Sequence, residues 1–310
     1  TGEDQPGHDD LAEAVDLARL SEVAVIFAGL NDRFESEGFD RERLDLPNQD
    51  LLIDAVAKVN PRTVVVLYTG GAVSMEPWLD KVGAIIQAWY PGQEGGNAVA
   101  DVLLGNTNPS GKLPVSFIKK KEDSPAFKNY KDKNHKDPYS EGIFIGYRYL
   151  DKQGIEPRFP FGYGLSYTRF EYTDLRIEPS GAEGEGGIPY TVRVDIRNVG
   201  DREGAEVVQV YVKDAESRVE RPEKELKGFA KVLLKPGEKK TVSVILDRRA
   251  FAFYDTNRQG WEVEPGEFEI MVGSSSRDIR LHQRIIRGTL FEKSPWHGLP
   301  ISERSFPWFD

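Results

Sequence analysis

Apolar and polar residues follow different periods in the two halves of this 310-residue chain. In the first half, short apolar runs alternate with stretches in which apolar residues recur every three or four positions. The runs predict buried strands at 23–30, 63–68 and 84–89, of which the first is expected to be fully buried. The stretches between them predict helices, one capped by Asp10 and others from about 48 to 59 and from 97 to 104. This order predicts an α/β fold, a mostly parallel sheet flanked by helices on both faces.

Three later stretches complete the first half. Residues 113–117 predict another strand, and the aromatic segment 139–149 predicts a strand-like element. Residues 159–167 hold proline, glycine and many large rings, too many rings for a flexible linker, so we expect a packed junction there. We therefore place one domain at 1–164 and a second at 165–310.

In the second half, apolar and polar residues alternate, which is the period of a strand with one solvated face. The alternation is clear at 190–198, 207–212, 240–246 and 268–273. Turn sequences separate these segments, for example Lys235-Pro236-Gly237. The pattern predicts an all-β, immunoglobulin-like sandwich of about seven strands in two sheets. The aromatic tail after Phe291, with Trp296, Phe306, Trp308 and Phe309, is expected to pack back onto the body.

Composition narrows the classes of partner and cofactor. The net charge of −10 argues against nucleic acid or an anionic membrane as a partner, and no apolar run approaches the roughly 20 residues of a membrane span. The chain has no cysteine, and its four histidines lack ligand spacing, so we expect no metal and no cofactor. The lack of cysteine and of N-glycosylation acceptors favours an intracellular location, with secretion as the alternative.

A group of charged side chains directly follows the run 23–30. Residues 31–41 contain six ionisable side chains, including Glu35, Glu37 and Arg41. Ligands of open α/β sheets bind at the carboxyl ends of the strands, so charges placed there favour a functional site. A solvated acidic loop is the plain alternative. The glycine pairs at 70–71 and 95–96 match neither dinucleotide nor Walker spacing, which disfavours nucleotide binding.

Four stretches in the same order resemble glycoside hydrolase family 3, the β-glucosidase type. They are Glu35-Ser36-Glu37-Gly38-Phe39-Asp40-Arg41 with Leu46-Pro47, then residues 87–98, 108–114 and 159–167. The resemblance covers nearly the whole chain, and the last stretch is similar to the entry into that family's fibronectin type III-like domain. The second half is therefore expected to be fibronectin type III-like.

The resemblance also implies that part of the enzyme lies outside this chain. In the family, an aspartate nucleophile sits on a (β/α)8 barrel that precedes the α/β domain, and no barrel fits in these 310 residues. The chain is thus expected to be a C-terminal portion. In some members a PA14-type insert interrupts the α/β domain before the acidic loop, and a start at Thr1 suits a chain that begins where such an insert ends.

By the same resemblance, Glu37 is the general acid/base and Glu35 is the alternative. Asp40 and Arg41 are expected to form an ion pair in the loop or to contact sugar, and Phe34 to wall the leaving-group site or to anchor the loop. Trp89 and Tyr90 are expected in the domain core.

The implied function is hydrolysis of terminal β-linked glucosyl residues by a retaining mechanism. The implied partners are a β-glucoside or oligosaccharide substrate and the N-terminal barrel segment, and a homo-oligomer is left open. A non-catalytic carbohydrate-binding or scaffold module is the alternative. The paired carboxylates after a buried strand favour the enzyme, because an adhesion module has no need of them.

Overall fold

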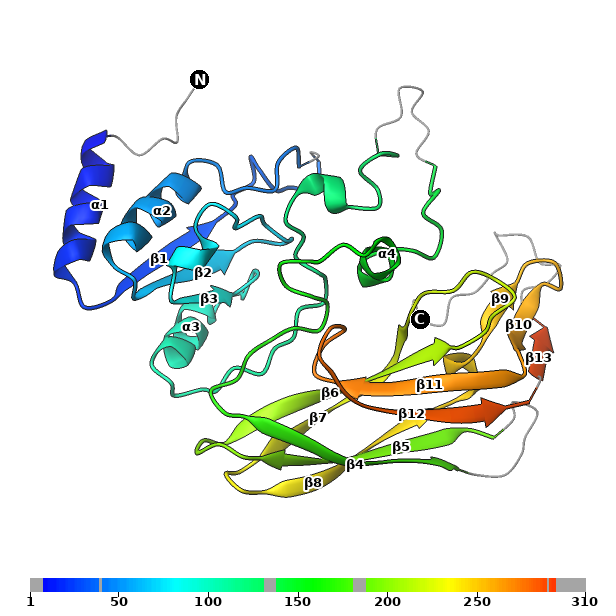
Figure 1. Cartoon of the computed structure of the whole chain (residues 1–310). Coiled ribbons are helices and arrows are strands. Elements are labelled where there is room, and N and C mark those ends of the chain that lie inside the picture. The colour runs from blue at the N-terminus through cyan, green and yellow to red at the C-terminus, as the bar shows by residue number, and fades with distance from the viewer. Residues whose placement is uncertain (1–7, 39–40, 131–137, 181–187, 289, 294–310) are drawn as a thin grey trace. The chain divides into compact units, whose positions relative to one another are not determined.

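The computed structural model describes residues 8–38, 41–130, 138–180, 188–288 and 290–293 (Figure 1). The chain folds into two compact units. The first contains Thr1–Thr107 and Leu113–Phe161, and the second contains Asn108–Lys112 and Gly162–Asp310. The short segment Asn108–Lys112 packs with the second unit, where the Asn108 side chain accepts hydrogen bonds from the Ser166 hydroxyl (3.0 Å) and the Tyr167 amide (2.8 Å).

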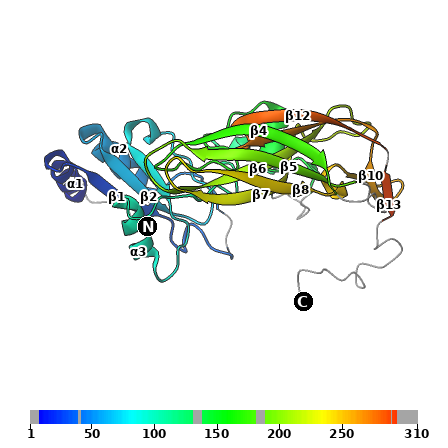
Figure 2. The ribbon, with the colours of Figure 1, turned by 90° about the horizontal axis from the view of Figure 1, so that it is seen from below.

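The first unit is built on a parallel sheet with helices on both faces, which confirms the predicted α/β class. Its strands are β1 (Ala24–Gly29), β2 (Thr63–Tyr68) and β3 (Ala84–Gln87), in the order β1-β2-β3. The helices are α1 (His8–Leu20), α2 (Gln49–Val59), α3 (Gly95–Leu103) and α4 (Tyr147–Gln153), with 3-10 turns η1 (Leu79–Lys81) and η2 (Lys121–Asp123). In Figure 2, α2 and α3 lie on opposite sides of this sheet, and α1 lies beside α2.

The core of the first unit covers only one face of its outer strand. Val65 and Leu67 of β2 pack with Ile53 of α2, and all three are fully buried. On β1, by contrast, Val25 and Phe27 are 41% and 60% exposed. The expected full burial of 23–30 is therefore wrong. Within the described sheet β1 is an edge strand, so its apolar composition does not report burial on both faces.

Two further segments, which the sequence predicts as strands, do not form strands. The segment 139–149 does not form a strand, and its last three residues begin helix α4 instead. Gly146 and Gly154, with φ of 53° and 63°, lie at the two ends of this helix, where left-handed backbone favours glycine. Residues 113–117 form a single bridge from Phe117 to Phe159 rather than a strand. Aromatic residues favour strands only weakly, and tertiary packing overrides that preference here.

The second unit is a β-sandwich, as the period-two pattern predicts. One sheet has the order β12-β11-β6-β7 and the other β4-β5-β8, and a small third sheet has the order β13-β10-β9. The strands are β4 (Phe170–Pro179), β5 (Tyr190–Asn198), β6 (Gly204–Asp214), β7 (Glu225–Leu234), β8 (Lys239–Leu246), β9 (Phe253–Asp255), β10 (Gly260–Val263), β11 (Gly266–Gly273), β12 (Ile279–Arg287) and β13 (Leu290–Lys293), with the 3-10 turn η3 (Arg248–Ala250).

Alternate residues of the sandwich strands form its core. Ile196 on β5, Val210 on β6 and Phe268 on β11 are all fully buried in one cluster. The aromatic tail residues Trp296, Phe306, Trp308 and Phe309 lie outside the described residues. Within the described ranges, no helix has the length and apolar character needed to cross a membrane.

Candidate functional site

The acidic stretch leaves the sheet at the carboxyl end of β1. The Leu30 amide still donates to the Tyr68 carbonyl of β2 (3.1 Å), and the chain then turns. The amides of Phe34 and Glu35 both donate to the Asn31 carbonyl, at 2.9 and 3.0 Å. Because the three strands are parallel, the loops that follow β1, β2 and β3 all begin at the same end of the sheet, where the carboxyl ends of the strands lie.

Glu35 joins these three loops. Its Oε2 accepts a hydrogen bond from the Gly70 amide, just beyond β2, and another from the Tyr90 hydroxyl, just beyond β3, both at 2.6 Å. Its Oε1 lies 3.6 Å from the Arg41 guanidinium. The Glu35 side chain is only 19% exposed. The carboxylate is therefore an internal acceptor at the centre of the loop cluster.

Arg41 holds the far end of the acidic loop. Its Nε donates to the Arg43 carbonyl (2.9 Å) and its Nη2 to the Leu44 carbonyl (3.2 Å). Burial lowers the pKa of the Arg41 guanidinium, and the nearby Glu35 carboxylate acts in the opposite direction. An arginine keeps its charge in proteins under either influence. Arg41 therefore lies beside Glu35 as a cation.

Glu37 lies between these two anchored residues and differs from Glu35 in its surroundings. Its side chain is exposed, and its carboxylate makes no hydrogen bond or ion pair with another described residue. The next residue, Gly38, has open space around it, and its amide donates to the Ser36 hydroxyl (3.3 Å). Asp40 lies outside the described residues, so its predicted role stays a prediction. The structure thus gives the two glutamates of the motif different environments, one engaged and one open to solvent.

Phe34 is half-buried and packs against the core cluster of the first unit, which supports the loop-anchor alternative. A substrate contact by Phe34 stays a prediction.

The third strand ends at Gln87, earlier than expected, so Trp89 and Tyr90 lie beyond it. Trp89 is half-buried against the same core and has φ of 56°, an uncommon left-handed backbone for a bulky residue. Tyr90 is 59% exposed, so its predicted place in the core is wrong. The Tyr90 phenol instead lies against Glu35, and the hydrogen bond to Glu35 is the main cause that raises the pKa of Tyr90.

Gly29 and Gln49 fix the point where the loop begins. The Gln49 side chain accepts from the Gly29 amide (2.8 Å) and donates to the Gly29 carbonyl (2.7 Å), as a neighbouring strand would. A Cβ at Gly29 would lie 2.5 Å from the Tyr68 carbonyl oxygen, which belongs to the backbone of β2.

Gly29→Ala should therefore lower the free energy of unfolding of the chain by about 1–3 kcal/mol, since the methyl group can be accommodated only by shifting backbone. Gly96→Ala is the matched control, because a Cβ there meets no atom within 4 Å. Urea unfolding measures both variants. An equal effect of the two substitutions would contradict the close approach of β1 to β2.

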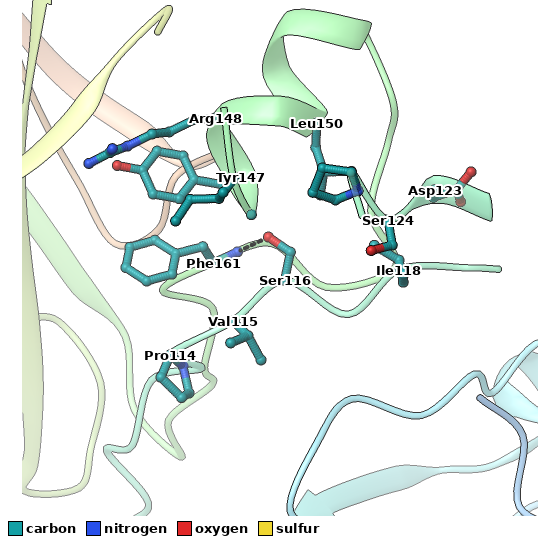
Figure 3. A pocket seen from close by; sticks show the side chains of 13 residues that line it. Pro114, Val115, Ser116, Ile118, Asp123, Ser124, Tyr147, Arg148, Leu150 and Phe161 are labelled. Atoms are coloured by element: carbon teal, nitrogen blue, oxygen red, sulfur yellow. Dashed lines mark hydrogen bonds between the residues drawn. The ribbon is translucent and has the colours of Figure 1, made fainter. Parts of the chain in front are cut away.

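A separate cavity lies elsewhere in the first unit, with an open volume of about 510 Å³. No residue of the acidic loop lines it. Figure 3 shows the ring of Phe161 beside that of Tyr147, with which it stacks at 4.8 Å, and the Phe161 amide donating to the Ser116 hydroxyl (3.1 Å). Its walls are mostly apolar, and it does not include the candidate acid/base residues.

Sequence reasoning did not identify Gly70 and Tyr90 as members of the site. Their place in the sequence could have identified them, because each follows a parallel strand and therefore lies at the same end of the sheet as Glu35. The site offers one solvent-facing carboxyl group, that of Glu37, on a loop in which Glu35 and Arg41 are held by hydrogen bonds. Such a carboxyl group suits proton transfer. No set of three or more histidine, aspartate or glutamate side chains in the described part of the chain is arranged to hold a metal ion.

Comparison with known proteins finds similarity to glycosidases. Residues 5–167 match the glycosyl hydrolase family 3 C-terminal domain, and residues 206–276 match a fibronectin type III-like domain. The thermostable beta-glucosidase B of Acetivibrio thermocellus is 52% identical over 88% of this chain and 36% of its own length. The crystal structure of a Kluyveromyces marxianus beta-glucosidase in complex with glucose has a TM-score of 0.87 at 43% identity, covering 94% of this chain and 35% of that one.

A Bifidobacterium adolescentis GH3 beta-glucosidase structure also has a TM-score of 0.87, at 39% identity, and covers 99% of this chain and 44% of its own. The chain therefore spans less than half of the length of each of these relatives.

Proposed function

The chain belongs to glycoside hydrolase family 3, and we propose that it is the C-terminal portion of a retaining β-glucosidase in which Glu37 is the general acid/base. The nucleophile of this enzyme is an aspartate on a (β/α)8 barrel segment outside the chain. The fibronectin type III-like unit accompanies the acid/base domain, as in the relatives that match both halves.

In the proposed reaction two carboxyl groups act on opposite sides of the glycosidic bond. The barrel aspartate attacks the anomeric carbon while the Glu37 carboxyl group gives its proton to the departing oxygen, so the glycosidic bond breaks and a covalent glycosyl-enzyme forms. Glu37, now a carboxylate, then takes a proton from water as the water attacks the same carbon, which releases the sugar and restores both groups.

The observation that carries this assignment is the contrast between the two glutamates. Glu37 is exposed and makes no hydrogen bond or ion pair with another described residue, so its carboxyl group is free to meet a substrate. Glu35 Oε2 already accepts two hydrogen bonds, whose donors need the lone pairs of that oxygen. A proton on Oε2 would compete with both donors, and a proton on either oxygen would remove the charge that faces Arg41 at 3.6 Å. Glu37 is therefore the better candidate, and Glu35 supports the loop.

The other predicted site residues take secondary places in the proposal. Asp40 is proposed to contact the sugar at the rim of the site. Arg41 is engaged by Glu35 and by two backbone carbonyls, which favours a role in loop structure. The substrate is proposed to be a β-glucoside or a short oligosaccharide with a terminal β-linked glucose, as the names of the relatives suggest.

The proposal is tested by completing the enzyme. This chain is joined to the N-terminal part of the A. thermocellus relative, and the product is called the complete enzyme below. We expect hydrolysis of an aryl β-glucoside by the complete enzyme, and hydrolysis near background by either part alone, because each part holds only one of the two carboxyl groups.

The control carries Glu37→Ala in the same complete enzyme. A complete enzyme that folds, binds glucose and yet has no activity above this control would contradict the proposal and favour a carbohydrate-binding or scaffold module.

A further inference from the structure

One carboxylate holds together loops that are far apart along the chain. Gly70 lies 35 residues from Glu35 and Tyr90 lies 55 residues from it, yet both donate to the same oxygen at 2.6 Å. The three residues follow β1, β2 and β3, which are the three strands of the described sheet in the first unit. A donor from each neighbouring loop therefore fixes where Glu35 lies.

These three residues approach so closely that a side chain at Gly70 would have to displace the Tyr90 ring. A Cβ at Gly70 would lie 2.8 Å from the Tyr90 ring and 3.4 Å from the Glu35 carboxyl carbon. The phenol ring, the peptide of Gly70 and the carboxylate are thus in direct contact. Between the end of β3 at Gln87 and Tyr90, the backbone of Trp89 has φ of 56°. This uncommon backbone lies directly beside the candidate site, where strained residues concentrate.

Glu35 is only two residues from Glu37, which limits how far the two can move independently. Two extended residues span at most about 7 Å. Arg41 lies beside Glu35 on the other side of the loop and is tied to the backbone at Arg43 and Leu44. The exposed carboxyl group of Glu37 thus projects from a short segment that is held at Glu35. A general acid must come within about 2.6–3.2 Å of the atom it protonates, so small displacements of this segment matter.

We propose that Tyr90 is a positioning residue for proton donation: its phenol holds Glu35, and Glu35 fixes the segment that presents Glu37. The inference rests on the proposed role of Glu37. Tyr90 does not touch the substrate in this arrangement, and it acts only through the two glutamates. At neutral pH the phenol stays protonated and keeps its hydrogen bond, since that hydrogen bond raises the pKa of Tyr90 from its ordinary value.

Tyr90→Phe in the complete enzyme removes the donor and keeps the ring. We expect kcat/KM to fall about tenfold for a β-glucoside with a poor leaving group, such as an alkyl glucoside, which needs the proton. We expect less than a twofold change in kcat/KM for 2,4-dinitrophenyl β-glucoside, whose leaving group departs without a proton, and an unchanged inhibition constant for glucose. A merely structural role of Tyr90 would affect both substrates alike.

Two controls distinguish a positioning role of Tyr90 from a general disturbance of the fold. Tyr139→Phe is the matched substitution, because Tyr139 belongs to the same unit, is 85% exposed and lies outside the site, and it should change neither substrate's rate. Adding Tyr90→Phe to Glu37→Ala should have no further effect on the alkyl glucoside, because a residue that acts only through Glu37 has nothing left to position.

If Tyr90→Phe does not fold, a substitution of Glu35 tests the same inference. Glu35→Ala removes the acceptor that Tyr90 and Gly70 share, so it should show the same dependence on the leaving group, and adding it to Glu37→Ala should have no further effect on the alkyl glucoside.

Two results would overturn the inference: equal losses on both substrates, or a full additional loss from Tyr90→Phe in the Glu37→Ala background. The proposed function itself fails differently, because Glu37→Ala alone would then show no dependence on the leaving group.

Discussion

Glu37→Ala in the complete enzyme should slow the hydrolysis of a β-glucoside with a poor leaving group by about 10²–10⁴-fold, which is the range that general acid–base catalysis contributes. The reason is that the departing alkoxide would leave without a proton. An activated aryl glucoside should still form the glycosyl-enzyme, which then accumulates because no base activates water. Steady-state kinetics with both substrates, and a burst of released phenol, measure these effects.

Added azide should restore turnover of the activated substrate by Glu37→Ala, because a small anion needs no general base and can enter the space left by the carboxylate. Glu42→Ala is the matched control, since Glu42 is an exposed glutamate a few residues further along the chain. We expect it to behave like the wild type and to show no response to azide. If Glu35→Ala gives the azide response and Glu37→Ala does not, the roles of the two glutamates must be exchanged.

Phe268→Ala should destabilise the β-sandwich by about 3–5 kcal/mol, the usual range for a large side chain removed from a core. Phe268 is fully buried on β11, and its ring meets that of Phe251 edge to face with centroids 5.3 Å apart. Truncation would therefore remove apolar contacts and leave a cavity between the two sheets. Urea unfolding of the whole chain measures the loss as a lower transition midpoint.

Phe229→Ala is the matched control, because Phe229 lies in the same unit on β7 but is 67% exposed. Its removal should change the free energy of unfolding by less than about 1 kcal/mol. Hydrogen exchange should then locate the effect of Phe268→Ala in the second unit, with faster exchange in β6 and β11 and little change in the first unit. Comparable losses from the two alanine variants would mean that the strand faces are assigned wrongly.

Sequence periodicity predicts best where burial and local pattern agree. The strand at 63–68 has the predicted bounds, because β2 is the central strand of the described sheet. The pattern of 23–30 is equally apolar, but β1 lies at an edge, and an apolar run does not show which neighbours a strand has. The strand predicted at 139–149 fails because aromatic residues favour strands only weakly, and only the last three residues of the segment belong to a regular element, helix α4.

In the candidate site, too, some features can be predicted from the sequence and others depend on tertiary contacts. The sequence places Glu35, Glu37 and Arg41 in one loop after a strand, and the structure brings Glu35 and Arg41 to within 3.6 Å of each other. Nothing in the local pattern distinguishes the two glutamates, and Tyr90 follows an apolar run that suggests a core position.

The order of β1 to β3 and α1 to α3 can be predicted from the sequence by itself. So can the change from an α/β pattern to a two-residue period and the position of the acidic loop after a strand, because each depends on neighbours along the chain. Only the tertiary structure decides that Glu35 is engaged, that Glu37 is exposed and that Tyr90 lies against the loop. These facts depend on the hydrogen bonds that Glu35 accepts from Gly70, 35 positions away, and from Tyr90, 55 positions away. Both form only after the three parallel strands have brought their carboxyl ends together.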